Sequence, residues 1–142
     1  MIAITPEINA IKTILSFIFD YYNHNFKLDI RLDFTDRENN CSYIQDVGID
    51  IGIGYLLRTY NDEESRARHN YNSLMEYSII ILLHEIGHAI DFKYNYKDYI
   101  EKHWDMLEKY NRGKVNRKNY AQLPLERRAD YFANHEKERW IK

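Results

Sequence analysis

Apolar residues near the start of the chain recur at intervals of three and four positions, which is the spacing of one face of an α-helix. They are Ile8, Ile11, Ile14, Leu15, Ile18 and Phe19. Pro6 suits the first turn of such a helix, where a proline removes no intrahelical hydrogen bond, and the polar run Asn23-His24-Asn25 suits its end. The pattern therefore predicts a helix over residues 6–22.

Two later segments alternate between apolar and polar residues, which is the period of a β-strand. Residues 28–34 place apolar and charged side chains on opposite faces. Residues 47–54 place Val and Ile on one face and Asp50 with three glycines on the other, where another backbone or a ligand could approach closely. Because the two segments are close in sequence, we expect a mainly antiparallel sheet with one exposed face.

The second half of the chain is predicted to be helical. Ser73 and Glu76 fit a capping box at a helix start, and the apolar residues that follow predict a helix to about Phe92. This helix is apolar on most sides, so it is expected at the centre of the domain. Further helices are predicted over residues 97–110 and 124–140, the last of them opened by a proline.

Length and composition fit one globular unit. The chain has 142 residues, enough for a single hydrophobic core, so residues 1–142 are treated as one domain. Hydrophobic residues make up 44% of the chain and charged residues 30%, a balance typical of folded proteins. The predicted class is α+β, with an N-terminal helix, a small sheet, a central helix and a C-terminal helix.

Charge and cysteine content exclude several functional classes. Lys and Arg total 20 against 22 for Asp and Glu, so no general attraction to nucleic acid or to an anionic membrane is expected. Cys41 is the single cysteine, which excludes an internal disulfide framework and a cysteine-rich zinc site. The start of the chain lacks the basic region of a signal peptide, and the apolar run over residues 79–83 is far shorter than the ~20 residues that span a bilayer. A cytoplasmic protein is expected.

The central helix carries the motif His84-Glu85-Ile86-Gly87-His88, which is HExxH. Residues four positions apart share one helix face, so the two imidazoles can converge on a single ion. Imidazole nitrogen suits Zn²⁺, and Glu85 is placed to take a proton from a zinc-bound water. The alternative is a core helix with two hydrogen-bonded histidines, but these buried polar groups would then need partners among aliphatic neighbours.

A catalytic zinc also needs a third protein ligand and an open position for water. Glu126 and Asp130 lie four positions apart on the predicted last helix. The glutamate can complete the ligand set, and the aspartate can hydrogen-bond the far nitrogen of a ligating imidazole and fix its tautomer. Alternatively, both carboxylates form surface ion pairs with Arg127 or with other basic residues.

Other residues offer weaker alternatives. Asp91 lies on the central helix, where a third ligand from the same helix would sit nearly two turns from the first, so we expect it to contact a neighbouring residue instead. Stabilising an oxyanion needs a further donor, for which Tyr120 is a candidate, with Arg127 or Arg128 as substitutes. Residues 47–54 could pair with an extended substrate if they form an edge strand, or could be an ordinary core strand.

HEIGH at residues 84–88, followed by ExxAD at 126–130 and by Phe132-Ala133, resembles the gluzincin branch of the zincin-like metallopeptidases. The order of helix, two strands, motif helix and late glutamate helix is similar to the minimal gluzincins. It also resembles the small ImmA/IrrE-like metallopeptidases of bacterial and phage genomes. The resemblance covers residues 28–133 and implies a zincin-like fold, encoded by a phage or another mobile element. One position departs from the ImmA-like pattern, because Arg128 stands where those proteins often carry an acidic residue.

The resemblance implies a role for each motif residue. His84, His88 and Glu126 would bind one Zn²⁺ per chain, Glu85 would act as general base, and Asp130 would support a histidine. The expected activity is zinc-dependent cleavage of a peptide or protein substrate, as an endopeptidase. Two alternatives stay open: a regulatory or protein-binding domain that keeps zinc for stability and cleaves little or nothing, and a metal-free helical interaction module. The sequence leaves the substrate specificity and the oligomeric state open.

Overall fold

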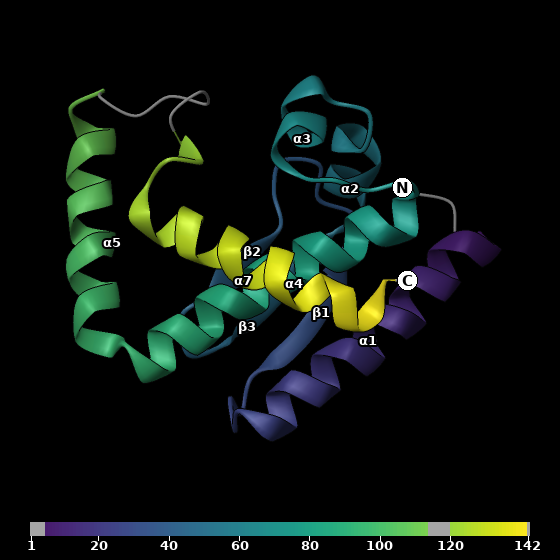
Figure 1. The fold of residues 1–142 in the computed structure, drawn as a ribbon, viewed down its shortest axis with the longest axis horizontal. Helices are drawn as coiled ribbons and strands as arrows, with labels where there is room; N and C mark the ends of the chain where they lie inside the picture. Colours follow the sequence, from purple (N-terminus) through teal and green to yellow (C-terminus); the bar gives the residue numbers. More distant parts are fainter. Residues whose placement is uncertain (1–4, 114–119, 142) are drawn as a thin grey trace.

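The computed structural model describes residues 5–113 and 120–141, which form an α+β fold made mostly of helices (Figure 1). In chain order the elements are α1 (Pro6–Asn25), β1 (Arg31–Thr35), β2 (Ser42–Ile44), β3 (Gly48–Gly52), α2 (Ile53–Thr59), α3 (Glu63–Arg68), α4 (Leu74–Tyr94), α5 (Tyr96–Asn111) and α7 (Pro124–Trp140). None of the described helices combines the length and the apolar character that crossing a bilayer requires.

The predicted helices are confirmed, with ends that differ by a few residues. The hydroxyl of Thr5 caps α1 by accepting a hydrogen bond from the backbone N–H of Ile8 at 3.2 Å. The hydroxyl of Ser73 accepts from the N–H of Glu76 at 3.1 Å and caps α4, whereas the Glu76 carboxylate accepts from the N–H of Asn72 at 3.3 Å. Local capping therefore fixes where both helices begin.

The sheet is mixed, and the prediction of a mainly antiparallel sheet is wrong. The strand order is β1-β3-β2, in which β1 pairs parallel with β3 and β2 pairs antiparallel with it. A parallel pair needs a long connection, and the chain between β1 and β3 supplies one by forming β2 on the far side of β3. β2 was not predicted, because a strand of three residues is too short to display a period.

β3 lies at the centre of the sheet and is buried at every position. The strand predicted over residues 47–54 is therefore a core strand and not an edge strand, and it is shorter than predicted, since β3 covers Gly48–Gly52 and Ile53 already begins α2. The predicted close approach at the glycine face is made by the protein's own backbone, since a Cβ at Gly52 would lie 2.4 Å from the carbonyl oxygen of Asn40. The exposed edge on this side of the sheet belongs to β2.

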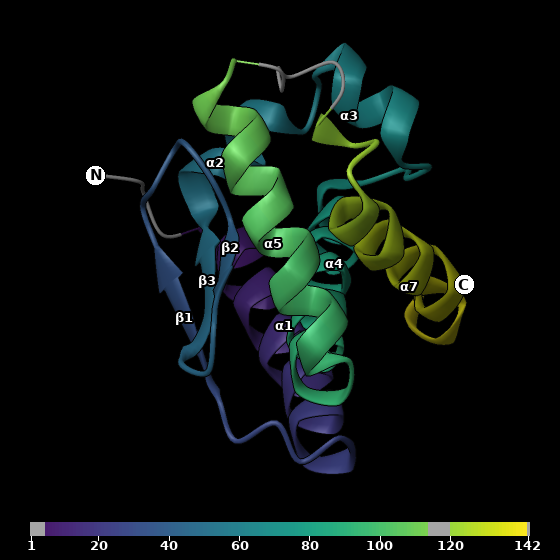
Figure 2. The same ribbon diagram turned by 90° about the vertical axis from the view of Figure 1, so that its left-hand side faces the viewer.

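α4 occupies the middle of the molecule, as predicted. Figure 2 shows α5 crossing in front of α4, with the sheet on one side and α7 on the other. α4 contacts α1, α5, α7 and the sheet, and its residues from Tyr77 to Ala89 are all buried. A helix surrounded in this way can place polar side chains only where neighbouring elements supply partners for them.

α7 approaches α4 closely at Gly87, inside the HExxH motif. A Cβ at Gly87 would lie 3.2 Å from the Cα of Ala129 and 3.2 Å from the Cβ of Phe132. Two small residues therefore let the two helix backbones pack tightly at this point. The close contact brings the first two turns of α7, which carry Glu126 and Asp130, next to the HExxH turn of α4.

Candidate metal centre

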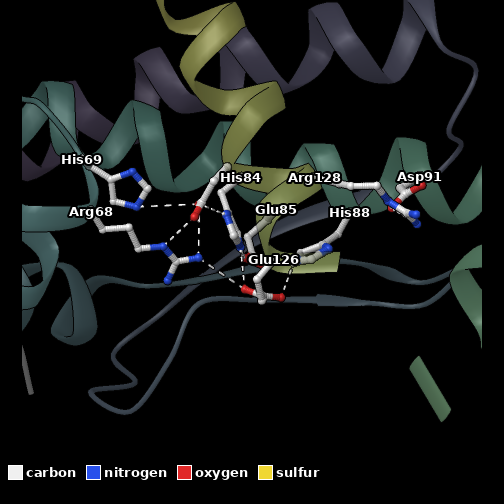
Figure 3. A network of polar contacts seen from close by, with 9 residues as sticks. Arg68, His69, His84, Glu85, His88, Asp91, Glu126 and Arg128 are labelled. Atoms are coloured by element: carbon white, nitrogen blue, oxygen red, sulfur yellow. Dashed lines mark hydrogen bonds and ion pairs between the residues drawn. The ribbon is translucent and has the colours of Figure 1, made fainter. Parts of the chain in front are cut away.

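The two motif imidazoles on α4 face the carboxylate of Glu126 on α7 (Figure 3). His84 Nε2 lies 3.0 Å from Glu126 Oε1, and His88 Nε2 lies 2.9 Å from Glu126 Oε2. All three side chains are buried. The structure therefore brings together the three residues predicted as metal ligands, from helices that lie far apart in the sequence.

The spacing of these atoms is close to that of ligands around one small ion. Zinc–nitrogen and zinc–oxygen bonds of about 2.1 Å put two ligand atoms of a tetrahedral site about 3.4 Å apart. The observed nitrogen–oxygen separations of 2.9 and 3.0 Å are a few tenths of an ångström shorter. Two imidazoles and a carboxylate also form a donor set that suits Zn²⁺, so the residues fit the ion that the sequence predicts.

Asp130 holds His84 on the side away from Glu126. Asp130 Oδ1 lies 2.7 Å from His84 Nδ1, so the carboxylate can accept the hydrogen of that nitrogen. While His84 is protonated, its Nε2 likewise donates to Glu126. When Nε2 gives up its proton, as a metal ligand must, the bond to Asp130 keeps the other hydrogen on Nδ1 and leaves the lone pair of Nε2 facing the centre. His88 differs, because its buried Nδ1 has no hydrogen-bond partner among the described residues.

Two residues that the sequence did not connect with this centre lie beside Asp130. Arg68, the last residue of α3, donates from Nε to Asp130 Oδ2 at 2.7 Å and from Nη2 to Asp130 Oδ1 at 3.1 Å. His69 falls in a polar stretch of sequence but is buried, with its Nε2 3.9 Å from Asp130 Oδ1. No local pattern could reveal these contacts, since they join the end of α3 to the distant α7.

Hydrogen bonds and charge shift the pKa values of this cluster. Burial lowers the pKa of His84, but its hydrogen bonds to Asp130 and Glu126 outweigh burial and raise the pKa to about 10. Burial raises the pKa of Glu126, but the hydrogen bonds from His84 and His88 hold it well below its usual range. The pKa of Asp130 is likewise lowered, since the bonds from His84 and Arg68 outweigh burial. Both carboxylates therefore stay ionised, as a metal ligand and its supporting acid must be.

Glu85 lies beside the two imidazoles and is also buried. Its Oε2 is 4.0 Å from His84 Nε2, and the backbone N–H of Tyr43 on β2 donates a hydrogen bond to its carboxylate. Burial raises the pKa of Glu85 overall, although His84 and His88 act in the opposite direction. A carboxylate with a raised pKa is suited to accept a proton and to release it again.

The centre opens into a cavity of about 650 Å³, a size typical of ligand sites. His84, Glu85, His88 and Glu126 all line this cavity. The edge strand β2 and the loop before it form one wall, and α5 forms another with mostly large side chains. The α5 residues in that wall are Tyr99, His103, Met106 and Tyr110.

Tyr120, the predicted oxyanion donor, also lines the cavity. Burial, followed by the negative charge of Glu126, raises the pKa of its phenol above the usual range. The phenol therefore keeps its proton at neutral pH and can donate a hydrogen bond. Its role in stabilising an oxyanion stays a prediction.

The two arginines considered as substitutes for Tyr120 lie elsewhere. Arg127 and Arg128 line a separate pocket on the other side of the α4–α7 contact. Arg128 donates to Asp91 at 2.9 Å and also pairs with Asp98 on α5. Asp91 thus contacts a neighbouring residue rather than the candidate metal centre, as expected. Among the arginines, Arg68 does line the cavity.

His69 should make the stability of the fold depend on pH. Burial lowers its pKa to about 4 in the folded chain, below the ~6.5 expected when it is unfolded. The unfolded chain therefore takes up a proton first as the pH falls. The contribution of neutral His69 to the free energy of unfolding is therefore complete above pH ~6.5. It is lost as the pH falls toward ~4, which lowers the free energy of unfolding by up to about 3 kcal/mol.

Urea unfolding followed by tryptophan fluorescence, between pH 7 and pH 4.5 in a chelator, checks this expectation. As the pH is lowered, the free energy of unfolding should decrease less steeply in His69→Phe than in the wild type. The exposed His135 provides a matched control, and His135→Gln should keep the wild-type slope. Equal slopes in His69→Phe and the wild type would contradict the expectation that the lowered pKa of His69 makes the stability depend on pH.

Comparisons with known proteins found no match for this chain, whether with family models, with curated proteins or with solved structures. The likeness to gluzincins therefore rests on the motif residues alone. The fold brings together two imidazoles, His84 and His88, and the carboxylates of Glu85 and Glu126 at the wall of one cavity. Asp130 contacts His84 from behind this wall, and Arg68 lies beside Glu126.

Proposed function

We propose that this chain is a zinc-dependent metallopeptidase of the zincin-like type. The observation that carries the proposal is the convergence of His84, His88 and Glu126 at 2.9–3.0 Å in the wall of a cavity. Catalytic zinc sites use three protein ligands and keep a fourth position for water or substrate. The position of this donor set at a cavity wall, rather than inside a closed core, favours a catalytic role over a purely structural one.

Each remaining group has a task in peptide hydrolysis. A bound zinc ion supplies Lewis acidity, which acidifies a water molecule and polarises a carbonyl group. Glu85 takes the proton from the attacking water and later delivers it to the leaving amine. Asp130 keeps His84 in the required tautomer, and Tyr120 donates a hydrogen bond to the oxygen that becomes negative.

The edge strand β2 offers a place for the backbone of a substrate. An extended peptide can add to an exposed strand edge through main-chain hydrogen bonds. Ser42 and Tyr43 of β2 line the cavity, whereas β3 lies inside the sheet and cannot accept another strand. A peptide or protein substrate would thus lie along β2, with its scissile bond beside Glu85.

A peptide library tests the proposal. The zinc-loaded protein is incubated with the library, with and without a zinc chelator, and new peptide termini are identified by mass spectrometry. We expect cleavage that the chelator abolishes and that added zinc restores. Bound zinc without any new termini would favour the alternative of a zinc-stabilised binding domain. Absence of bound metal would contradict both.

A further inference from the structure

Arg68 contacts both acidic side chains that α7 contributes to the candidate metal centre, Asp130 and Glu126. Figure 3 shows Arg68 pointing toward Glu126. Its Nε and Nη2 atoms donate to the two oxygens of Asp130 at 2.7 and 3.1 Å. The same Nη2 lies 3.5 Å from Glu126 Oε1, the oxygen that faces His84. The side chain is 27% exposed, so these contacts are mostly shielded from water.

The bonds to Asp130 fix the orientation of that carboxylate. Asp130 Oδ1 faces both His84 Nδ1 and Arg68 Nη2, while Asp130 Oδ2 accepts from Arg68 Nε. A guanidinium that binds a carboxylate through two parallel donors restricts its rotation, which a single ammonium cannot do. The plane of the Asp130 carboxylate sets the direction of its bond to His84. The orientation of the imidazole therefore depends on Arg68.

The positive charge of Arg68 also offsets repulsion between acids. Glu126 and Asp130 are both held ionised on one face of α7, and Glu85 lies 4.0 Å from the same His84 nitrogen that Glu126 contacts. Like charges that lie close together in a partly buried site repel one another unless a cation lies between them. Arg68 lies against both carboxylates of α7, so it lowers the cost of keeping them close to the imidazoles.

We propose that Arg68 is a positioning residue of the metal centre, which sets the metal affinity by orienting Asp130, and through it His84, and by holding Glu126. This inference rests on the proposed function, because it requires that His84, His88 and Glu126 bind zinc. Arg68 lies on a different element from every predicted ligand, so α3 also becomes part of the centre. α3 has no buried residue of its own, so the bonds of Arg68 help to hold it against α7.

Two substitutions of Arg68 separate its effect on the orientation of Asp130 from the effect of its positive charge. Arg68→Gln removes the cation and the paired donors, whereas Arg68→Lys keeps the charge but loses the planar pair. Arg66→Gln is the matched control, because Arg66 lies on the same helix but stacks on Tyr71 at 4.2 Å and donates to its carbonyl oxygen. Zinc affinity is measured by competition with a chromophoric chelator, and ligand geometry by the visible absorption of the Co²⁺-substituted protein.

We expect Arg68→Gln to weaken zinc binding by about 10–100-fold, the range found for partners that support a metal ligand. Arg68→Lys should fall between Arg68→Gln and the wild type, and both should alter the Co²⁺ spectrum, while Arg66→Gln leaves affinity and spectrum unchanged. If Arg68→Gln fails to fold, Arg68→Lys carries the test. Wild-type affinity and spectrum in a folded Arg68 variant would overturn the inference. Failure of the wild type to bind zinc would instead overturn the proposed function.

Discussion

Replacing Glu85 by glutamine is expected to lower the rate of peptide cleavage by about 10²–10⁴-fold, the usual contribution of a general base. Glutamine keeps the size of the side chain but cannot accept the proton of the attacking water. The ligands His84, His88 and Glu126 are untouched, so the zinc content should stay at the wild-type value. The initial rate of formation of library cleavage products, measured beside the zinc content of each preparation, checks both parts.

Glu76→Gln is the matched control for this change. Glu76 lies in the first turn of the same helix, accepts a hydrogen bond from the N–H of Asn72, and does not line the cavity. A glutamine at this position can still accept that bond, so cleavage should proceed at the wild-type rate. A fully active Glu85→Gln protein would refute the role assigned to Glu85 while leaving the metal site possible.

Zinc is expected to raise the melting temperature of the metal-free protein by about 10 °C. A ligand present at a hundred times its dissociation constant stabilises the folded state by about 2.7 kcal/mol, and each kcal/mol shifts the melting temperature of a chain of this size by about 4 °C. Glu126→Gln removes the ligand that joins α7 to the two imidazoles of α4. We expect the rise with zinc to be nearly absent in this variant.

Thermal unfolding followed by circular dichroism, with and without added zinc, measures both shifts. Glu138→Gln is the matched control, because Glu138 is an exposed residue near the other end of α7. This control should show the full wild-type rise. The same rise in Glu126→Gln as in the wild type would mean that zinc binds elsewhere or without this carboxylate.

The four long helices α1, α4, α5 and α7 could be predicted from sequence because their signals are local, whereas the short helix α2 was not predicted and begins inside a segment expected to be a strand. The prolines at the starts of α1 and α7 and the Ser73 cap of α4 act within one turn of the helix end. The sheet could not be predicted to the same extent. β1 and β3 pair across an intervening strand, and that parallel register depends on contacts that no short window of sequence contains.

The candidate site likewise contains residues that local sequence predicts and residues that only the tertiary fold brings in. The spacing of His84 and His88 on one helix face is a local property, so their convergence was predictable. The meeting of α4 and α7 was expected from the resemblance of the motifs, and the contact itself depends on the close approach at Gly87. The involvement of Arg68 and His69 could not be predicted, because only the tertiary fold brings the end of α3 and the residue after it to Asp130.

The zinc content of the purified protein tests the central claim most directly. After dialysis against metal-free buffer, elemental analysis should find about one zinc atom per chain in the wild type, as expected for a single site with three protein ligands. Glu126→Gln treated in the same way should retain much less. A wild-type protein that is folded, has been offered zinc and retains none would contradict the existence of the metal centre, and with it the proposed hydrolase.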